Sequence, residues 1–272
     1  MAEPNPVDAL APGQIEEKAE TIGVGKARMP RARQFILAMM AGIFIGFGAL
    51  SMIFVKADGT LSFAGSQFFG GLAFSVGLFL VLCAGAELFT GNSLMICGRL
   101  SGRYSWGELL SSWGVVYLGN LVGSLLLVLV VALSGVAGMG DGAVGAAMVK
   151  VASGKVTMGW GSIFFRGVLC NMLVCLAVWM GFGAHSTVDK LLSAMLPVTA
   201  FVACGFEHCV ANMFFIPMGI AASAMGFAPE GAVAVDLGGF LYNLSAATLG
   251  NLLGGVVLIG CMYWYAFKGG KK

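Results

Sequence analysis

Charge is scarce in this chain. Charged residues make up only 10% of its 272 residues, whereas hydrophobic residues make up 58%. A soluble domain carries roughly 25% charged and 45–50% apolar residues. The composition therefore excludes an ordinary soluble fold and indicates a membrane protein. The formal net charge is only +2, and we expect no nucleic-acid partner.

Catalytic and metal-binding motifs are also missing. The sequence contains neither a GxSxG nor an HExxH motif, and its seven cysteines form no CxxC pair. A haem-carrying membrane subunit of an oxidoreductase is an alternative from a different class. It needs histidine pairs across a helix bundle, and this chain has only His185 and His208, which disfavours it. We therefore expect no enzyme activity, no metal and no cofactor.

Long apolar segments dominate what is present. Six are long enough to cross a bilayer, which takes about 20 residues. The second and fifth are too long for one straight helix, and the polar patches GAELFTGN (85–92) and GFEHCVAN (205–212) interrupt them. This pattern predicts an all-α membrane protein with six transmembrane helices, of which two are broken. The approximate spans are 35–55, 68–100, 108–134, 160–183, 191–225 and 240–267.

Basic residues in the connections predict the orientation, because cytoplasmic loops carry an excess of Lys and Arg. Eleven lie on the side of the termini and three on the other. Both termini are therefore expected in the cytoplasm. The polar N-terminus has no apolar core of the signal-peptide kind. We expect a cytoplasmic segment (1–30), a six-helix pore domain (31–267) and a cytoplasmic tail (268–272).

The two halves of the chain share short motifs. GAELFTGN and GFEHCVAN have Gly, Glu and Asn at the same spacing, 120 residues apart, and LGNLVG (118–123) matches LGNLLG (249–254), 131 residues apart. Each half contains three spans, so the second half must enter from the opposite face. The sequence thus predicts a 3+3 inverted repeat, an arrangement typical of transporters and channels. Half-helix N-termini that meet near the midplane favour a small anion.

The polar residues of the two breaks have different expected roles. Glu87 and Glu207 are equivalent, and we expect their carboxylates to accept free backbone N–H groups and hold the loops, with Asn92 and Asn212 acting similarly. His208 has no equivalent, since its counterpart is a leucine. An ionisable residue in mid-membrane is costly and marks a transport pathway by default.

Three longer stretches resemble the formate/nitrite transporter family, most closely its formate-channel branch. They are GGLAFSVGLFLVLCAGAELFTGN, LCNMLVCLAVWM and GFEHCVANMFFIP. The resemblance covers about residues 30–267. It implies an aquaporin-like protomer in a homopentamer of the bacterial inner membrane, with one pore per protomer. It also implies passage of formate, or alternatively of nitrite or hydrosulfide, with acetate and lactate as further candidate anions.

The resemblance also assigns site residues. It implies a central pore histidine at His208, a loop threonine at Thr90, a pore-lining Asn171 and an anion-attracting Lys155 in an outer loop. It further implies apolar constrictions, which hydrated ions cross only at a cost. These are Phe74 and Phe201 towards the outside, and Leu78, Leu88 and Val174 towards the cytoplasm, with Phe89 in the same loop as Thr90. Arg166 departs from the formate-channel pattern, which has an apolar residue there.

The expected mechanism is pH-dependent. His208 would exchange a proton with the weak-acid anion, because a neutral acid crosses an apolar slit far more cheaply than an ion. The loop from Gly85 to Gly91 is expected to be the most variable part of the core, since glycine permits unusual backbone conformations. The N-terminal segment is expected to cover the inner mouth or to bind a cytoplasmic enzyme.

Overall fold

The protein folds into helices and their connections. The computed structural model describes residues 9–269, and within that range it contains no β-strand, which confirms the predicted all-α class. The predicted terminal segments fall partly outside this range, at residues 1–8 and 270–272. The α-helices are α1 (Pro12–Ala27), α2 (Arg31–Ala57), α3 (Phe63–Leu80), α4 (Ile96–Leu100), α5 (Trp106–Leu133), α6 (Ala143–Val156), α7 (Trp160–Gly183), α8 (Thr187–Ala203), α9 (Cys209–Ala224), α10 (Leu237–Leu252) and α11 (Met262–Lys268).

Non-α helical segments extend two of these helices. A π-helical segment, Val81–Gly85, continues α3, and another, Leu253–Cys261, joins α10 to α11. Short 3₁₀ segments lie at Gly91–Met95 and Val136–Gly138. A π-helix is uncommon and often occurs at functional sites; no pattern of apolar residues distinguishes it from an α-helix in the sequence.

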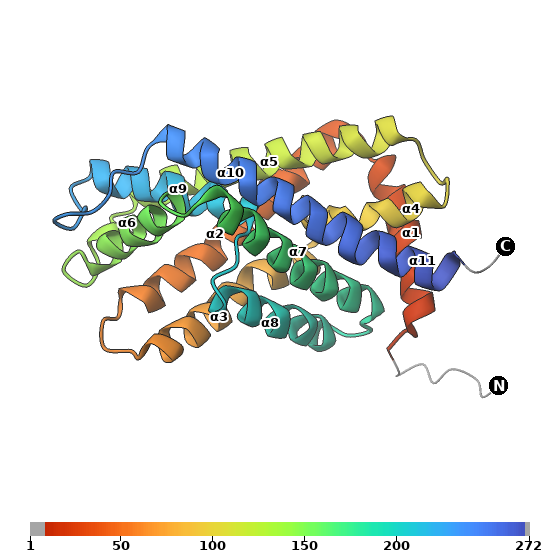
Figure 1. The fold of residues 1–272 in the computed structure, drawn as a ribbon, viewed down its shortest axis with the longest axis horizontal. Coiled ribbons are helices and arrows are strands. Elements are labelled where there is room, and N and C mark those ends of the chain that lie inside the picture. Colours follow the sequence, from red (N-terminus) through yellow and green to blue (C-terminus); the bar gives the residue numbers. More distant parts are fainter. Residues whose placement is uncertain (1–8, 270–272) are drawn as a thin grey trace.

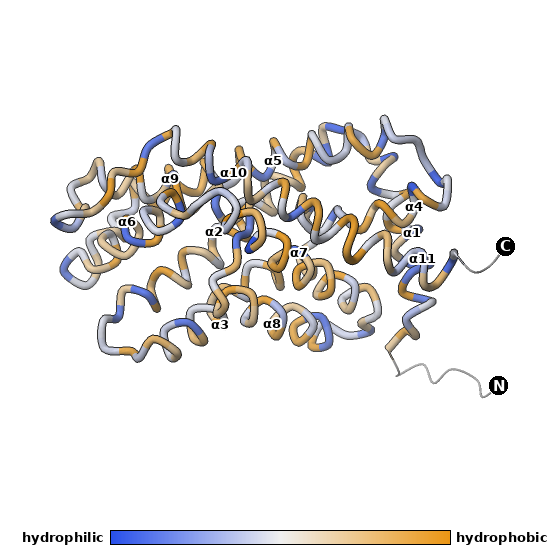
Figure 2. The backbone as a smooth tube through the Cα atoms, in the orientation of Figure 1, coloured by the Kyte–Doolittle hydropathy of each residue, from blue (hydrophilic) through white to orange (hydrophobic). Residues whose placement is uncertain are grey.

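Among residues 9–269, five helical stretches are long and apolar enough to cross a membrane. They correspond to five of the six predicted spans and are Arg31–Ala57, Phe63–Gly85, Trp106–Leu133, Trp160–Gly183 and Leu237–Lys268. The remaining predicted span, 191–225, contains the two shorter helices α8 and α9 instead. Figure 2 shows hydrophobic residues along most of these helices.

The helices begin where the sequence supplies capping groups. Ser105 caps α5 and pairs with Glu108, Ser186 caps α8 and pairs with Asp189, and Asp236 caps α10. Each side-chain oxygen accepts a backbone N–H that has no partner within its helix. These caps fix the starting points of the long apolar helices.

The helices pack in two similar groups. α2 contacts α3 and α5, α7 contacts α8 and α10, and α3 contacts α8 across the two groups. α1 contacts α4 at one end, and α6 contacts α9 at the other. Figure 1 shows α1, α4 and α11 together at one end of the molecule and α6 at the other. We call this end the terminal side and the opposite end, which carries α6, the far side.

A buried acidic pair fastens α1 to the terminal side. The Glu16 and Glu20 carboxylates lie 3.5 Å from Lys268 Nζ, and Glu20 also pairs with Arg103 at 3.4 Å. Both glutamates are buried. Burial and the neighbouring Glu20 carboxylate raise the pKa of Glu16 from 4.5 to about 7, and Lys268 opposes this shift. The docked helix therefore favours the protonated form of Glu16.

The docking of α1 is predicted to weaken as the pH rises. Because the pKa of Glu16 is raised in the folded state, its stabilising contribution is present below pH 4.5 and is lost by about pH 7. Hydrogen-exchange protection of residues 12–27, corrected for intrinsic rates, should be lower above pH 7 than below pH 4.5. Glu16→Gln should remove most of this difference. Glu17→Gln, at the exposed neighbouring position, should leave it unchanged; equal behaviour of the two variants would contradict the assignment.

Candidate functional site

Both polar patches interrupt their helices after a glycine in the left-handed conformation. Gly85 has a φ of 81° and Gly205 a φ of 68°. A residue with a Cβ is strained there, which explains why glycine opens both patches. Residues 86–88 and 206–208 that follow are non-helical. Such backbone within an apolar interior needs hydrogen-bond partners from elsewhere in the protein.

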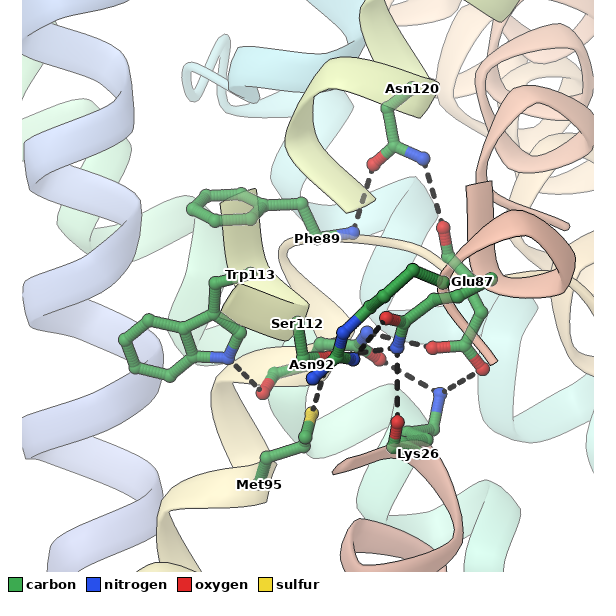
Figure 3. Close-up of polar contacts among 10 residues, drawn as sticks. Lys26, Glu87, Phe89, Asn92, Met95, Ser112, Trp113 and Asn120 are labelled. Atoms are coloured by element: carbon green, nitrogen blue, oxygen red, sulfur yellow. Dashed lines mark hydrogen bonds and ion pairs between the residues drawn. The ribbon is translucent and has the colours of Figure 1, made fainter. Parts of the chain in front are cut away.

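Two asparagines from the LGNLxG motifs satisfy this backbone in matching ways. Asn120 Oδ1 accepts from Phe89 N–H (2.9 Å), and its Nδ2 donates to the carbonyls of Glu87 (2.9 Å) and Ala38 (2.8 Å). Asn251 Oδ1 accepts from Cys209 N–H (2.9 Å), and its Nδ2 donates to the carbonyls of Glu207 (2.9 Å) and Gly167 (2.8 Å). Figure 3 shows the first of these contacts.

The glycines of the same motifs allow close helix crossings. A Cβ at Gly123 would collide with the Met39 carbonyl of α2, and a Cβ at Gly254 would collide with the Val168 carbonyl of α7. The repeated sequence therefore has a double purpose. Its glycines bring two backbones together, and its asparagine then reaches the interrupted helix.

Each break also contains an ion pair between a half-buried lysine and a buried glutamate. Lys26 Nζ donates to Glu87 Oε1 (2.9 Å) and Asn92 Oδ1 (2.8 Å), as Figure 3 shows, and Asn92 Nδ2 donates to Glu87 Oε2 (2.8 Å). On the far side, Lys155 Nζ donates to Glu207 Oε1 (2.8 Å) and Asn212 Nδ2 donates to Glu207 Oε2 (2.7 Å).

These contacts correct one expectation from the sequence. Within residues 9–269, the Glu87 and Glu207 carboxylates accept from lysine and asparagine side chains, and no backbone N–H donates to them. One backbone N–H of each loop, that of Phe89 or Cys209, donates to Asn120 or Asn251 instead. The N–H groups of the two glutamates donate to backbone carbonyls of neighbouring helices. A buried carboxylate is more strongly compensated by an ammonium group than by a neutral donor.

Two lysines lie in positions that the sequence does not predict. Lys155 lies near the end of α6, not in an outer loop as predicted. The sequence predicts for Lys26 only a place in the polar N-terminus, although it makes the equivalent ion pair. The available signal was spacing, since Lys26 and Lys155 are 129 residues apart, close to the separations of the shared motifs.

His208 contacts the other break directly. Its Nε2 lies 2.8 Å from Thr90 Oγ1, and its Nδ1 accepts from Ala211 N–H (3.0 Å) as the N-cap of α9. Because a backbone N–H can only donate, Nδ1 must present a lone pair. The hydrogen bonds therefore assign the neutral Nε2–H tautomer, which donates to Thr90.

Two cavities approach this contact from opposite sides. The terminal-side cavity has a volume of about 370 Å³ and is lined by Lys26, Arg33, Leu88 and Val178, among others. The far-side cavity, about 60 Å³, is lined by His208, Lys155, Glu207 and Asn212, with an aromatic wall of Phe74, Phe201, Phe206 and Phe215. The Thr90–His208 pair lies between them, because Leu88 and Gly91 on either side of Thr90 line the terminal-side cavity and His208 lines the far-side cavity.

The other predicted residues have varied positions. Phe74 and Phe201 meet edge to face with centroids 5.8 Å apart, and the Phe201 ring stacks on His208 at 6.0 Å. Leu78 and Val174 are buried and line neither cavity. Phe89 packs against Tyr117 at 4.9 Å.

Asn171 also lines neither cavity. Its Nδ2 donates to Ser93 Oγ (3.1 Å) and to the Asn251 carbonyl (2.7 Å), which fastens α7 to the segment after Thr90. Arg166 is exposed on α7 and donates to the Gly205 carbonyl (3.2 Å), while its own carbonyl accepts from Glu207 N–H.

Comparison with known proteins identifies the family. The model of the family described as "Formate/nitrite transporter" matches residues 13–265. The chain belongs to the formate/nitrite transporter family. The resemblance noted in the sequence is thereby confirmed, as is the expectation of a transport protein that is not an enzyme. The membership and the apolar helices also indicate an integral membrane protein.

Individual relatives in this transporter family are similar over most of their length. "Formate channel FocA" of Escherichia coli strain K12 is 40% identical, with 98% of each chain covered. "Nitrite transporter NirC" of Salmonella typhimurium is 36% identical, with 85% of this chain and 82% of that protein covered. A solved structure described as "Pentameric formate channel with formate bound" has a TM-score of 0.77 and 38% identity, covering 87% of this chain and 97% of that chain.

Loss of either asparagine clamp is predicted to destabilise the fold. Asn251→Leu leaves one N–H and two carbonyls without their partner, and buried unsatisfied groups cost about 1–3 kcal/mol each. We expect a loss of about 2–5 kcal/mol in unfolding free energy, measured by denaturation in detergent, with a similar loss for Asn120→Leu. Ser51→Ala removes only a bond within its own helix and serves as the control; an Asn251→Leu protein as stable as this control would contradict the prediction.

Proposed function

We propose that the protein is a pH-dependent membrane channel for formate and related small anions of weak acids. The observation that carries the proposal is the contact between Thr90 and His208, which joins the two helix breaks between cavities from opposite sides. The E. coli relative described as a formate channel, at 40% identity, supports formate as the cargo.

The proposed architecture is an aquaporin-like inverted repeat of three plus three spans with broken second and fifth helices. It is supported by the equivalent contacts of Asn120 and Asn251 and of Lys26 and Lys155. Residues 31–267 would form the pore domain, with 1–30 and 268–272 in the cytoplasm of a bacterium and the pore in its inner membrane. The terminal-side cavity is then the inner vestibule. The solved pentameric relative supports a homopentamer.

The residues that line the two cavities suggest how the anion would be attracted and then dehydrated as it crosses the protein. Lys26 and Arg33 in the inner vestibule and Lys155 in the outer one would attract it, although Lys26 and Lys155 also neutralise Glu87 and Glu207. The aromatic wall around His208 would then remove its water, which is costly for an ion. A proton taken up at this point lowers that cost.

His208 and Thr90 are the proposed source of this proton. The neutral Nε2–H of His208 donates to Thr90 Oγ1, so the threonine hydroxyl is free to donate in turn to a carboxylate. Full proton transfer from an imidazolium requires a second proton at Nδ1. That proton would face Ala211 N–H and break the cap of α9, so we propose that proton exchange is coupled to movement in the first turn of α9.

Nitrite is the second candidate cargo, because the 36% identical relative from Salmonella typhimurium is described as a nitrite transporter. Hydrosulfide, acetate and lactate remain further candidates. Competition between formate and each of these anions for uptake into proteoliposomes separates the cargoes: the physiological one should inhibit formate flux at the lowest concentration.

Replacement of His208 is predicted to impair transport and its pH response. Removal of a group that takes part in proton transfer commonly costs about a hundredfold or more, so for His208→Phe we expect formate flux into liposomes to fall at least about tenfold. The dependence of flux on pH between about 5 and 8 should flatten, because no other histidine lies near the cavities. Stopped-flow measurement of internal pH provides the readout.

His185 offers a matched control for this experiment. It lies exposed between α7 and α8, so His185→Phe removes the same type of side chain away from the proposed pore. Its flux and pH profile should equal those of the unmodified protein. A His208→Phe protein that keeps the normal flux and pH profile would overturn the proposed role.

A further inference from the structure

A third cavity opens at the far side and has no role in the mechanism above. Its volume is about 480 Å³, larger than that of either pore cavity. The end of α2, the start of α3 and the middle of α6 form its walls, with Lys56, Asp58, Gln67, Lys150 and Gly154 among the lining residues. We call it the rim cavity.

The rim cavity lies outward of the far-side cavity along the same faces of three helices. On α2 and α6 the residues that line the two cavities are four positions apart, and on α3 they are seven apart. Residues at these spacings share one face of an α-helix. The pairs, far-side cavity first, are Met52 with Lys56, Lys155 with Val151, and Phe74 with Gln67.

Two lysines give the rim cavity its positive charge. Lys56 is half-buried and its Nζ donates to Gln67 Oε1, while Gln67 Nε2 donates to the Ala203 carbonyl (2.8 Å), which holds the ammonium group in place. Lys150 is exposed, and no hydrogen bond or ion pair to it occurs within residues 9–269. Both lysines line the same cavity, so an anion bound between them would offset the repulsion of their like charges.

Asp58 limits the charge of the anion that fits. Its Oδ1 accepts from Thr60 N–H (2.8 Å) and Thr60 Oγ1 (2.7 Å), and these bonds lower the pKa of its carboxyl, so it remains ionised at neutral pH. The three charged side chains therefore sum to a single positive charge. A small monovalent oxyanion matches this charge, whereas a dianion is less well compensated.

We propose that Lys56 and Lys150 form a second anion-binding site, which collects small monovalent oxyanions, carboxylates among them, directly outward of the pore vestibule. The inference that this site delivers anions to the pore rests on the function proposed above. The binding of such anions in the rim cavity does not depend on that function, so anion binding and transport can be tested separately.

The test uses methanesulfonate added outside right-side-out vesicles that contain the full-length protein. A sulfonate stays ionised at any accessible pH, so it can occupy the rim cavity but cannot cross an apolar slit as a neutral acid. We expect it to inhibit formate uptake competitively, compared with chloride at equal ionic strength. In Lys56→Gln/Lys150→Gln the inhibition constant and the apparent KM for formate should each rise at least about threefold, with the rate at saturating formate unchanged.

Three further variants distinguish a loss of charge in the rim cavity from misfolding and from a general effect of removing a lysine. Lys56→Arg/Lys150→Arg keeps the charge and should behave as the unmodified protein. Lys150→Gln alone changes an exposed residue, and should show part of the effect even if the double variant folds poorly. Lys190→Gln removes the same charge at a half-buried position near the start of α8 on the other side and should have no effect. Unchanged inhibition and KM in both glutamine variants at the rim cavity would overturn the proposal.

A second readout distinguishes this proposal from the proposed function. Methanesulfonate should slow acylation of Lys150 by a membrane-impermeant amine reagent, measured by mass spectrometry, and should leave Lys190 in solubilised protein unaffected. If the unmodified protein carries no formate but Lys150 is protected, the transport function fails and the anion site stands. If Lys150 gains no protection, the anion site fails whatever the formate flux.

Discussion

The need to satisfy non-helical backbone inside an apolar protein governs this structure. Residues 86–88 and 206–208 are non-helical, so some of their backbone groups need partners from other segments, and the membrane interior offers no water to supply them. Asn120 and Asn251 supply the missing partners, and the glycines around them bring the supporting helices close enough to do so. The helix crossings, the shared motifs and the position of His208 all follow from this requirement.

The two breaks share a scaffold but differ in their chemistry. Glu87 and Glu207 are paired with lysines in the same way, yet only the second break follows its glutamate with a histidine. The asymmetry extends to the lysines. Lys26 donates to Asn92 Oδ1, whereas the equivalent Asn212 Oδ1 is buried without a partner among the described residues. The two breaks thus share the Lys–Glu pair, while the hydrogen bonds of their asparagines differ on the two sides of the Thr90–His208 contact.

Much of this arrangement could be predicted from the sequence, because the residues that form it belong to motifs that occur in both halves of the chain. The apolar runs predicted the long helices, and the spacing of Gly, Glu and Asn related Glu87 to Glu207. The sequence does not reveal the role of Lys26, because a lysine in a polar terminus resembles any solvated charge. It also does not reveal α6, because this helix has 14 residues and a bilayer span takes about 20. The partners of Asn171 depend on packing between helices, for which a single sequence holds no signal.

The cap formed by His208 connects the scaffold to the proposed chemistry. Nδ1 accepts the Ala211 N–H that α9 leaves free at its first turn, and this bond keeps the proton on Nε2, facing Thr90. A histidine placed elsewhere on the pore wall would lack this constraint and would take up a proton at either nitrogen. Here an imidazolium forms only if α9 gives up its cap, so the helix start itself opposes a lasting positive charge. In the proposed mechanism such a residue would lend a proton only briefly and would not trap the anion.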